Sequence, residues 1–321
     1  MDQVSADRHS GPQDRSSGER SVTLSSAIRL PVKRLTILLN QAYEDYPVPV
    51  RLGEGQFESM CDDMDIDLAR SVVALADGEP VGLVLLSCRG SEGWVSGVGV
   101  HPAWRRRGIA RCMMREALRS AWRAGLERLR LEVLEQNDAA RTLYEELGFR
   151  QTRDLLALNL VPERLSPAVD PIGFGTVAPE RVSRLLREHA RFHEVDPSWQ
   201  RDLASLTKRI GYLMGLAYRE GAELEGYLIY QPQVGDFAVL DLAVNPVHPQ
   251  RLDVAQLMLS TLHEFSPGMD GHIINVPAED PLLPAFTAIG YRVWQRQHEM
   301  VSQRCRTWSR VEVDGDRPAG V

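Results

Sequence analysis

The residues from Val98 to Ala110 combine an apolar strand, a run of arginines and a glycine in an order that suits anion binding. The strand Trp94 to Val100 must end before Pro102, because proline lacks an N–H and fixes φ. Gly108 then permits a positive φ or a close approach, so that backbone N–H groups converge at the start of a helix running through Leu118. The helix dipole favours negative charge at the same point. We therefore predict a phosphate-binding loop here.

A second pattern follows a strand that contains Leu131 to Val133. The segment Asn137 to Phe149 reads N-D-A-A-R-T-L-Y-E-E-L-G-F, which is typical of a short capped helix. Asn137 or the residue after it can cap the first N–H groups, and Gly148 suits the left-handed position after the last turn. Apolar residues recur at helical spacing: Ala140, Leu143 and Leu147. Tyr144 lies beside that stripe, with its hydroxyl free to reach a ligand.

Together the two patterns resemble the acetyl-CoA site of the GNAT superfamily of N-acetyltransferases. R-x-x-G-x-A after V-x-V-x-P resembles the pyrophosphate loop of that family, and N-x-x-A-x-x-L-Y-x-x-x-G-F resembles its second cofactor motif. The resemblance implies acetyl-CoA as acyl donor, with no metal. It assigns cofactor binding to Val98, Gly99, Val100, Arg105, Arg106, Arg107, Gly108, Ile109, Ala110, Asn137, Ala140 and Tyr144.

The resemblance also implies direct transfer of the acetyl group to a primary amine of a small molecule, peptide or protein. The strand Val98 to Val100 would pair with the pantetheine arm and hold the thioester beside the acceptor. A backbone N–H of that strand, notably of Val98 or Val100, would stabilise the oxyanion. Tyr144 would protonate the departing thiolate.

The general base is open at this point. Because the strand Trp94 to Val100 carries no carboxylate, the candidates are Glu135 at the end of the next strand and Asp45 or Glu44 at the end of the first helix. Each of them could equally be a solvated surface group. The alternative function is a protein that senses acyl-CoA without turnover; Tyr144 favours the enzyme.

Composition narrows the class of protein. A chain of 321 residues suits about two domains, and 37 basic against 44 acidic side chains give a net charge of −7 that argues against nucleic acid as the main partner. The four cysteines are widely spaced, which indicates neither a disulfide framework nor a zinc site and fits a reducing cytoplasm. No signal core or bilayer-length apolar run is present. We expect a cytoplasmic protein without a membrane partner; a homodimer is one assembly to consider.

The predicted fold class is α/β, more narrowly α+β, with two tandem GNAT-like domains. Each domain is expected to be a mostly antiparallel sheet with a central splayed parallel pair, flanked by helices. The predicted boundaries are a disordered tail at 1–20, a catalytic domain at 21–161, a linker at 162–171, a degenerate domain at 172–304 and a tail at 305–321. In the first unit we expect helices at Leu30 to Tyr43 and Phe57 to Met64, hairpin strands at Ser71 to Ala76 and Val81 to Ser87, and a closing strand at Leu155 to Leu160.

The second half repeats this plan without its chemistry. The matching elements are expected at Val182 to Phe192, Leu213 to Tyr218, Leu224 to Tyr230, Ala238 to Val244, Leu257 to Phe265 and Ile273 to Val276, with Gly290 in the place of Gly148. Counted from Pro246, Leu252 and Val254 stand where Gly108 and Ala110 stood, with Asp253 between them. A carboxylate there repels pyrophosphate. Phe286, in the place of Tyr144, has no proton to give. We expect one acetyl-CoA per chain.

Tandem members similar to mycothiol synthase also pair a working half with a degenerate half. In mycothiol synthases, as the resemblance implies, the working half is the second. Here it is the first, which favours a general tandem N-acetyltransferase over that particular one.

Two weaker features remain. His189 and His193 are four residues apart on a predicted helix, a spacing that suits a metal, but no third ligand lies at a suggestive distance in the sequence, so a solvated helix face is expected. An acidic run is either a solvated face or an attractor for a cationic amine; it consists of Glu54, Glu58, Asp62, Asp63, Asp65 and Asp67.

Overall fold

The computed structural model describes residues 21–47, 50–165 and 175–304. The predicted tails at 1–20 and 305–321 and most of the predicted linker lie outside these residues. Strands are β1 Val22–Ser26, β2 Val72–Ala76, β3 Glu79–Arg89, β4 Glu92–Val100, β5 Arg128–Leu134, β6 Arg150–Leu160, β7 Gly175–Pro179, β8 Met214–Glu220, β9 Glu223–Pro232, β10 Asp236–Val244, β11 Asp270–Pro277 and β12 Arg292–Gln303. Helices are α1 Val32–Ala42, α2 Glu54–Asp63, α3 Ile109–Arg123, α4 Asp138–Glu146, α5 Val182–Leu185, α6 His189–Phe192, α7 Leu203–Lys208, α8 Arg251–Phe265 and α9 Leu283–Ile289.

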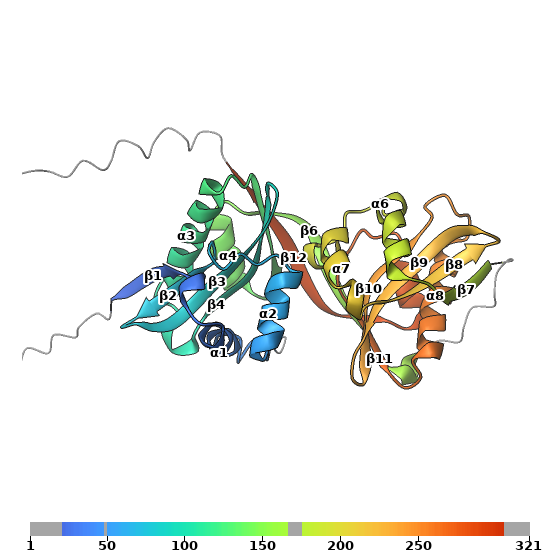
Figure 1. Ribbon diagram of the computed structural model, residues 1–321, viewed down its shortest axis with the longest axis horizontal. Helices are drawn as coiled ribbons and strands as arrows, with labels where there is room; N and C mark the ends of the chain where they lie inside the picture. Colours follow the sequence, from blue (N-terminus) through green and yellow to red (C-terminus); the bar gives the residue numbers. More distant parts are fainter. Residues whose placement is uncertain (1–20, 48–49, 166–174, 305–321) are drawn as a thin grey trace, which may run out of the picture.

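The twelve described strands form one continuous sheet in the order β1-β2-β3-β4-β5-β12-β6-β11-β10-β9-β8-β7. Two pairs are parallel, β4 with β5 and β10 with β11, and every other pair is antiparallel. The mixed α/β class and the central parallel pair in each half are confirmed. Figure 1 shows the two halves side by side, joined by the long strands β6 and β12.

The halves exchange their last strands. β12 lies between β5 and β6, from Gln297 opposite Leu134 to Gln303 opposite Arg128. β6 in turn pairs with β11 of the second half, with Gly271 opposite Leu160. The prediction that Leu155 to Leu160 closes the first unit is therefore wrong, because apolar alternation identifies a strand but not its partner. No strand is predicted after Gly290, where the structure has β12.

Helices cover both faces of each half. In the first half α1 and α2 pack on one face around Leu35, Leu38 and Phe57, and α3 and α4 pack on the other around Met113, Met114 and Phe149. In the second half α8 and α9 cover one face, and α5, α6 and α7 the other. These cores fix the strands whose divergence makes the site below.

One predicted helix is interrupted. Val182 to Phe192 forms α5 and α6, with a tighter 3-10 turn at Leu186–Glu188 between them. Over the described residues, no helix is long and apolar enough to cross a membrane.

Candidate functional site

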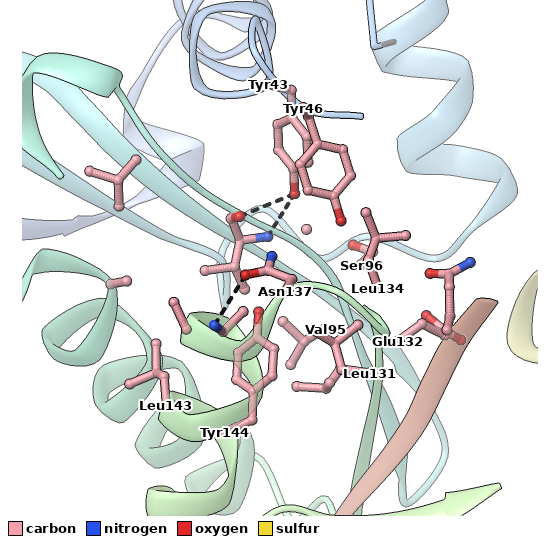
Figure 2. Close-up of a pocket in the computed structure, with 18 of the residues that line it drawn as sticks. Tyr43, Tyr46, Val95, Ser96, Leu131, Glu132, Leu134, Asn137, Leu143 and Tyr144 are labelled. Atoms are coloured by element: carbon pink, nitrogen blue, oxygen red, sulfur yellow. Dashed lines mark hydrogen bonds between the residues drawn. The ribbon is translucent and has the colours of Figure 1, made fainter. Parts of the chain in front are cut away.

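A cavity opens where β4 and β5 diverge. The two strands pair only from Glu92 opposite Arg128 to Trp94 opposite Arg130. Beyond that point the register of β4 on β3 shifts around Ser96, which bulges the strand away from its neighbour. The cavity, of about 700 Å³, lies between the separated strands and the ends of α1, α3 and α4. Figure 2 shows Tyr43 and Tyr46 entering from one side and Tyr144 from the other.

The predicted phosphate loop has the required backbone. Gly108 has a φ of 76° and is the N-cap of α3, and Arg106 is also left-handed, with a φ of 62°. A Cβ at Gly108 would meet no atom within 4 Å, so the glycine is needed for its φ and not for space. Left-handed residues alternating with right-handed ones turn successive N–H groups toward one point, which is an anion-binding arrangement. Arg106, Gly108 and Ile109 line the cavity.

The three arginines do different things. Arg105 forms an ion pair with Asp45, with Nη1 at 2.6 Å from Oδ2, and donates from Nε to the Val100 carbonyl at 3.0 Å. Arg106 faces the cavity. The Arg107 guanidinium lies 4.7 Å from the centre of the Trp104 ring, outside the cavity lining. Only part of the basic run therefore lines the cavity.

Tyr144 is presented by α4 as the sequence predicts. The Asn137 side chain caps this helix by accepting from the Ala140 N–H at 3.2 Å, and Gly148 is left-handed with a φ of 90°. Tyr144 is 7% exposed, and its hydroxyl makes no hydrogen bond within the described chain. It points into the cavity (Figure 2). Burial raises its pKa well above the ordinary value, so the phenol keeps its proton until a stronger base forms beside it.

The free edge of β4 is held by Tyr43. Its hydroxyl accepts from the Val98 N–H at 3.1 Å and donates to the Val98 carbonyl at 3.2 Å. The Val98 N–H that we expect to stabilise an oxyanion is thus already used, and a pantetheine arm pairs with this edge only by displacing the Tyr43 hydroxyl. Gly99 faces the other way, since a Cβ there would lie 2.7 Å from the Cβ of Ala42 on α1.

Glu132 on β5 is a carboxylate that the sequence reasoning missed. Its Oε2 accepts from Trp94 Nε1 at 2.6 Å, and its buried Oε1 has no hydrogen-bond partner in the described chain. Burial raises the pKa of this carboxyl to about 7, against the lowering effect of the Trp94 hydrogen bond. It is the one carboxylate among the described residues that line the cavity. The lone acid in the alternating run R-L-R-L-E-V-L could have indicated it.

The cavity brings together most of the predicted cofactor residues. The lining includes Val98, Val100, Arg105, Arg106, Gly108, Ile109, Ala110, Asn137, Ala140 and Tyr144, and leaves out Gly99 and Arg107. The candidate bases lie elsewhere: Glu135 and Glu44 are exposed and outside the lining, and Asp45 is bound to Arg105.

The acidic run also lies outside this cavity. Asp65 instead forms ion pairs with Arg89 and with Lys208 of the second half, so it helps to join the two halves and is not simply solvated.

The second half supplies one wall of the cavity. The residues that it contributes are Gln200, Ile274, Asn275, Trp294, Gln295 and Gln297. The segment before α7 is anchored to the first half, because Trp199 stacks on Trp94 at 6.0 Å and Asp202 forms an ion pair with Arg89 at 2.7 Å. Strand exchange therefore makes the cavity a joint product of both halves.

The equivalent gap of the second half is filled. β10 and β11 pair from Asp236 to Ala238 and then separate. Arg201, 3% exposed, lies across the separation and donates to the carbonyls of Leu240 at 2.9 Å and Asn275 at 3.4 Å.

The second half also lacks the loop. Gly82 faces Met113 in the first half, and its equivalent Gly226 faces Met258 in the second. Because Met113 follows Gly108 by five residues, the same count back from Met258 places Asp253 at the position of Gly108. This is one residue from the predicted Leu252. Described residues 245–253 include none that is left-handed. Phe286 matches Tyr144, because its carbonyl accepts from the Tyr291 N–H as that of Tyr144 accepts from Phe149.

The prediction of a solvated helix face at His189 and His193 is wrong. His189 is 6% exposed, and both rings turn toward the fully buried Asp241 on β10. Sequence spacing could not supply this third group, because β10 approaches α6 only in the folded chain.

Comparison with known proteins agrees with this architecture. Residues 36–149 match the model of the acetyltransferase (GNAT) family. A GCN5-related N-acetyltransferase from Sphaerobacter thermophilus superposes with a TM-score of 0.67 at 16% identity, over 88% of this chain and 95% of that one. A tandem GNAT protein from the clavulanic acid biosynthesis pathway gives 0.66 at 15%, over 88% and 98%. A putative acetyltransferase from Pyrococcus horikoshii gives 0.60 at 18%, over 93% and 94%. The chain thus has a tandem GNAT fold, and its residues 36–149 are a domain of the GNAT acetyltransferase family.

Proposed function

We propose that this protein transfers an acetyl group from acetyl-CoA to the primary amine of a small molecule, in the cavity between β4 and β5. The observation that carries the proposal is one cavity lined by an anion-binding loop at Gly108, a protonated phenol at Tyr144 and a buried carboxylate at Glu132. Together they supply a binding site for the donor, a proton for the departing thiolate and a base for the attacking amine.

The donor is assigned to the loop end of the cavity. The N–H groups from Arg106 to Ala110 and the start of α3 favour the pyrophosphate of CoA. Arg105, Arg106 and Arg111 are the lining cations among the described residues, and all belong to this end. The acyl arm runs from there along β4 toward Tyr144 once the Tyr43 hydroxyl has moved from Val98.

The reaction is a direct transfer. Glu132 removes a proton from the ammonium, the amine nitrogen attacks the thioester carbonyl, and the C–N bond forms. As the C–S bond breaks, Tyr144 gives its proton to the sulfur. The second proton of the attacking nitrogen then restores the phenol through solvent, and Glu132 returns its own proton to solvent. Glu132 replaces Glu135, Asp45 and Glu44 as our candidate base, because it lines the cavity and has a pKa near 7.

The acceptor end suits an amine with an apolar or aromatic body. Trp94, Trp294 and Ile274 provide apolar surface there, and Gln200, Asn275 and Gln297 provide neutral hydrogen-bonding groups. A cationic ammonium is matched by Glu132, whereas a carboxylate or phosphate on the acceptor finds no lining cation among the described residues at this end.

Thiol release from acetyl-CoA, measured over a panel of amines at constant donor concentration, tests this assignment. We expect turnover with alkyl and arylalkyl primary amines, and little with matched amines that carry a carboxylate. Absence of amine-dependent thiol release across the panel would contradict the enzyme, and a preference for anionic amines would contradict the acceptor class.

The alternative of acyl-CoA binding without turnover rested on the lack of a carboxylate in Trp94 to Val100. Glu132 on the adjacent strand supplies one within the same cavity. We therefore favour the enzyme.

A further inference from the structure

We propose that the second half contains a divalent transition-metal site formed by His189, His193 and Asp241, with Tyr227 as fourth ligand. The site lies on the face of the sheet covered by α6, away from the acyl-transfer cavity, whose described lining includes none of these residues. The inference is independent of the proposed function.

The ligand atoms are already gathered. His189 Nε2 lies 3.8 Å from Asp241 Oδ2, and His193 Nε2 lies 3.1 Å from Asp241 Oδ1. One ligand atom from each of the three residues lies within 4.8 Å of the others. Atoms bound tetrahedrally to zinc, at metal distances of about 2.0–2.2 Å, are roughly 3.3–3.6 Å apart. Small side-chain movements are enough to reach that geometry.

Tyr227 completes the set from β9. Its hydroxyl donates to Asp241 Oδ2 at 3.0 Å and lies 3.4 Å from His193 Nε2. Two imidazole nitrogens and one carboxylate oxygen are ligands that suit zinc and neighbouring divalent transition metals. The phenol oxygen adds a fourth donor once it has lost its proton. A site with four protein ligands is closed, which is typical of a structural metal and not of a catalytic one.

The polar groups are incompletely satisfied without an ion. The buried His189 Nε2 has no hydrogen-bond partner in the described chain, although it is aimed at Asp241. A metal ion between His189 and Asp241 would give this nitrogen the partner that the described chain does not supply.

The charged groups around the proposed site determine how favourably a divalent ion binds there. Asp241 is fully buried, and the buried Arg201 guanidinium is close enough to act on its carboxylate. When the ion binds, Tyr227 releases its proton to solvent, so a carboxylate and a phenolate balance the two charges of the metal. Arg201 stays as a neighbouring positive charge, which Asp280 partly offsets.

A metal here would join three separate segments. α6 has only four residues, too few to be stable alone, and the ion would tie it to β9 and β10. The same region holds Arg201, next to Gln200 in the wall of the cavity. The expected role is therefore to fix this wall from behind.

Metal titration of the untagged full-length protein tests the proposal. After removal of metals with a chelator, we expect one Zn²⁺ bound per chain and a melting temperature that rises with Zn²⁺ concentration. His189→Gln should lose this binding, and Tyr227→Phe should weaken it roughly ten- to hundred-fold. His272→Gln, on β11 outside the cluster, is the matched control and should bind as the wild type does.

Cobalt(II) provides a readout that needs no variant. Bound to the wild-type chain it should give the strong visible absorption of a four-coordinate ion, which Zn²⁺ then abolishes by displacement. Failure of the wild type to bind either ion, a six-coordinate cobalt spectrum, or unchanged zinc binding in folded His189→Gln would each overturn the site.

Discussion

The two halves contain the same gap between parallel strands but fill it differently. In the first half the gap beyond Trp94 is a cavity that leads from Gly108 to Glu132. In the second half the gap beyond Ala238 is crossed by the buried Arg201, which binds a carbonyl on each side. The fold thus provides a place for a ligand twice, and the side chains that enter the gap decide whether a ligand can use it.

The loop before α3 suits an anion, and the loop before α8 does not. The first loop has two left-handed residues and an arginine facing the cavity. The second places Asp253 at the start of α8, and the adjacent loop is bordered by Glu220 and Glu225. An anion is attracted at one helix start and repelled at the other.

The largest effect that we expect comes from Gly108→Asp. The substitution introduces strain at a left-handed position and a carboxylate against the phosphates, so acetyl-CoA affinity should fall by at least about 100-fold, equivalent to about 2.7 kcal/mol. Isothermal titration calorimetry measures it. Gly125→Asp is the control, because Gly125 at the other end of α3 has a φ of 86° and equally open surroundings. Equal acetyl-CoA affinity in the two folded variants would refute the loop assignment.

Glu132→Gln should lower kcat by roughly 100- to 10,000-fold while acetyl-CoA affinity is kept. A base must be ionised to accept a proton, so the wild-type kcat should rise with pH through about 7, following the raised pKa of this carboxyl. The variant should lose that rise. Glu135→Gln changes the exposed residue just beyond the same strand and should leave kcat and its pH profile unchanged. If Glu135→Gln lowered kcat and Glu132→Gln did not, Glu135 would be the base.

Tyr144→Phe should lower kcat by roughly ten- to a thousand-fold with acetyl-CoA affinity nearly intact. The phenol is buried and protonated, so the expected loss is that of the acid that serves the leaving thiolate. Rates must be measured where chemistry limits turnover. An unchanged kcat under that condition would mean that Tyr144 only packs against Phe149, 6.0 Å away between ring centres.

Arg201→Met should lower the stability of the protein and leave the stoichiometry of acetyl-CoA binding unchanged. Two carbonyls lose their donor and Asp241 loses a neighbouring cation, so the free energy of unfolding should fall by roughly 2–4 kcal/mol, observable as a lower melting temperature. No second acetyl-CoA should bind, because the second half still lacks a loop like that at Gly108. A second site appearing in this variant would show that Arg201 alone keeps the gap closed.

Local patterns in the sequence predicted the parts of the site that are local. The strand, glycine loop and capped helix around Gly108 and Tyr144 depend on neighbouring residues, and the structure has them in place. The exchange of β6 and β12 was not predictable, because strand pairing is a long-range choice. For the same reason Glu132 and the Asp241 cluster were missed: their importance comes from burial and from partners far away in the chain.

The exchange also changes how the division into domains can be tested. We still propose that 21–161 and 172–304 correspond to two GNAT-like units. A chain ending near Val161 would lose β12, however, and leave the edge of β5 unpaired. Substitutions in the full chain therefore separate the two halves better than truncation does.

The stoichiometry of acetyl-CoA binding to the full-length protein shows whether the donor site lies in the first half alone. We expect one acetyl-CoA per chain in calorimetric titration of the wild type and none in folded Gly108→Asp over the same concentration range. Two molecules per chain, or one retained by the variant, would contradict the assignment of the donor site to the first half.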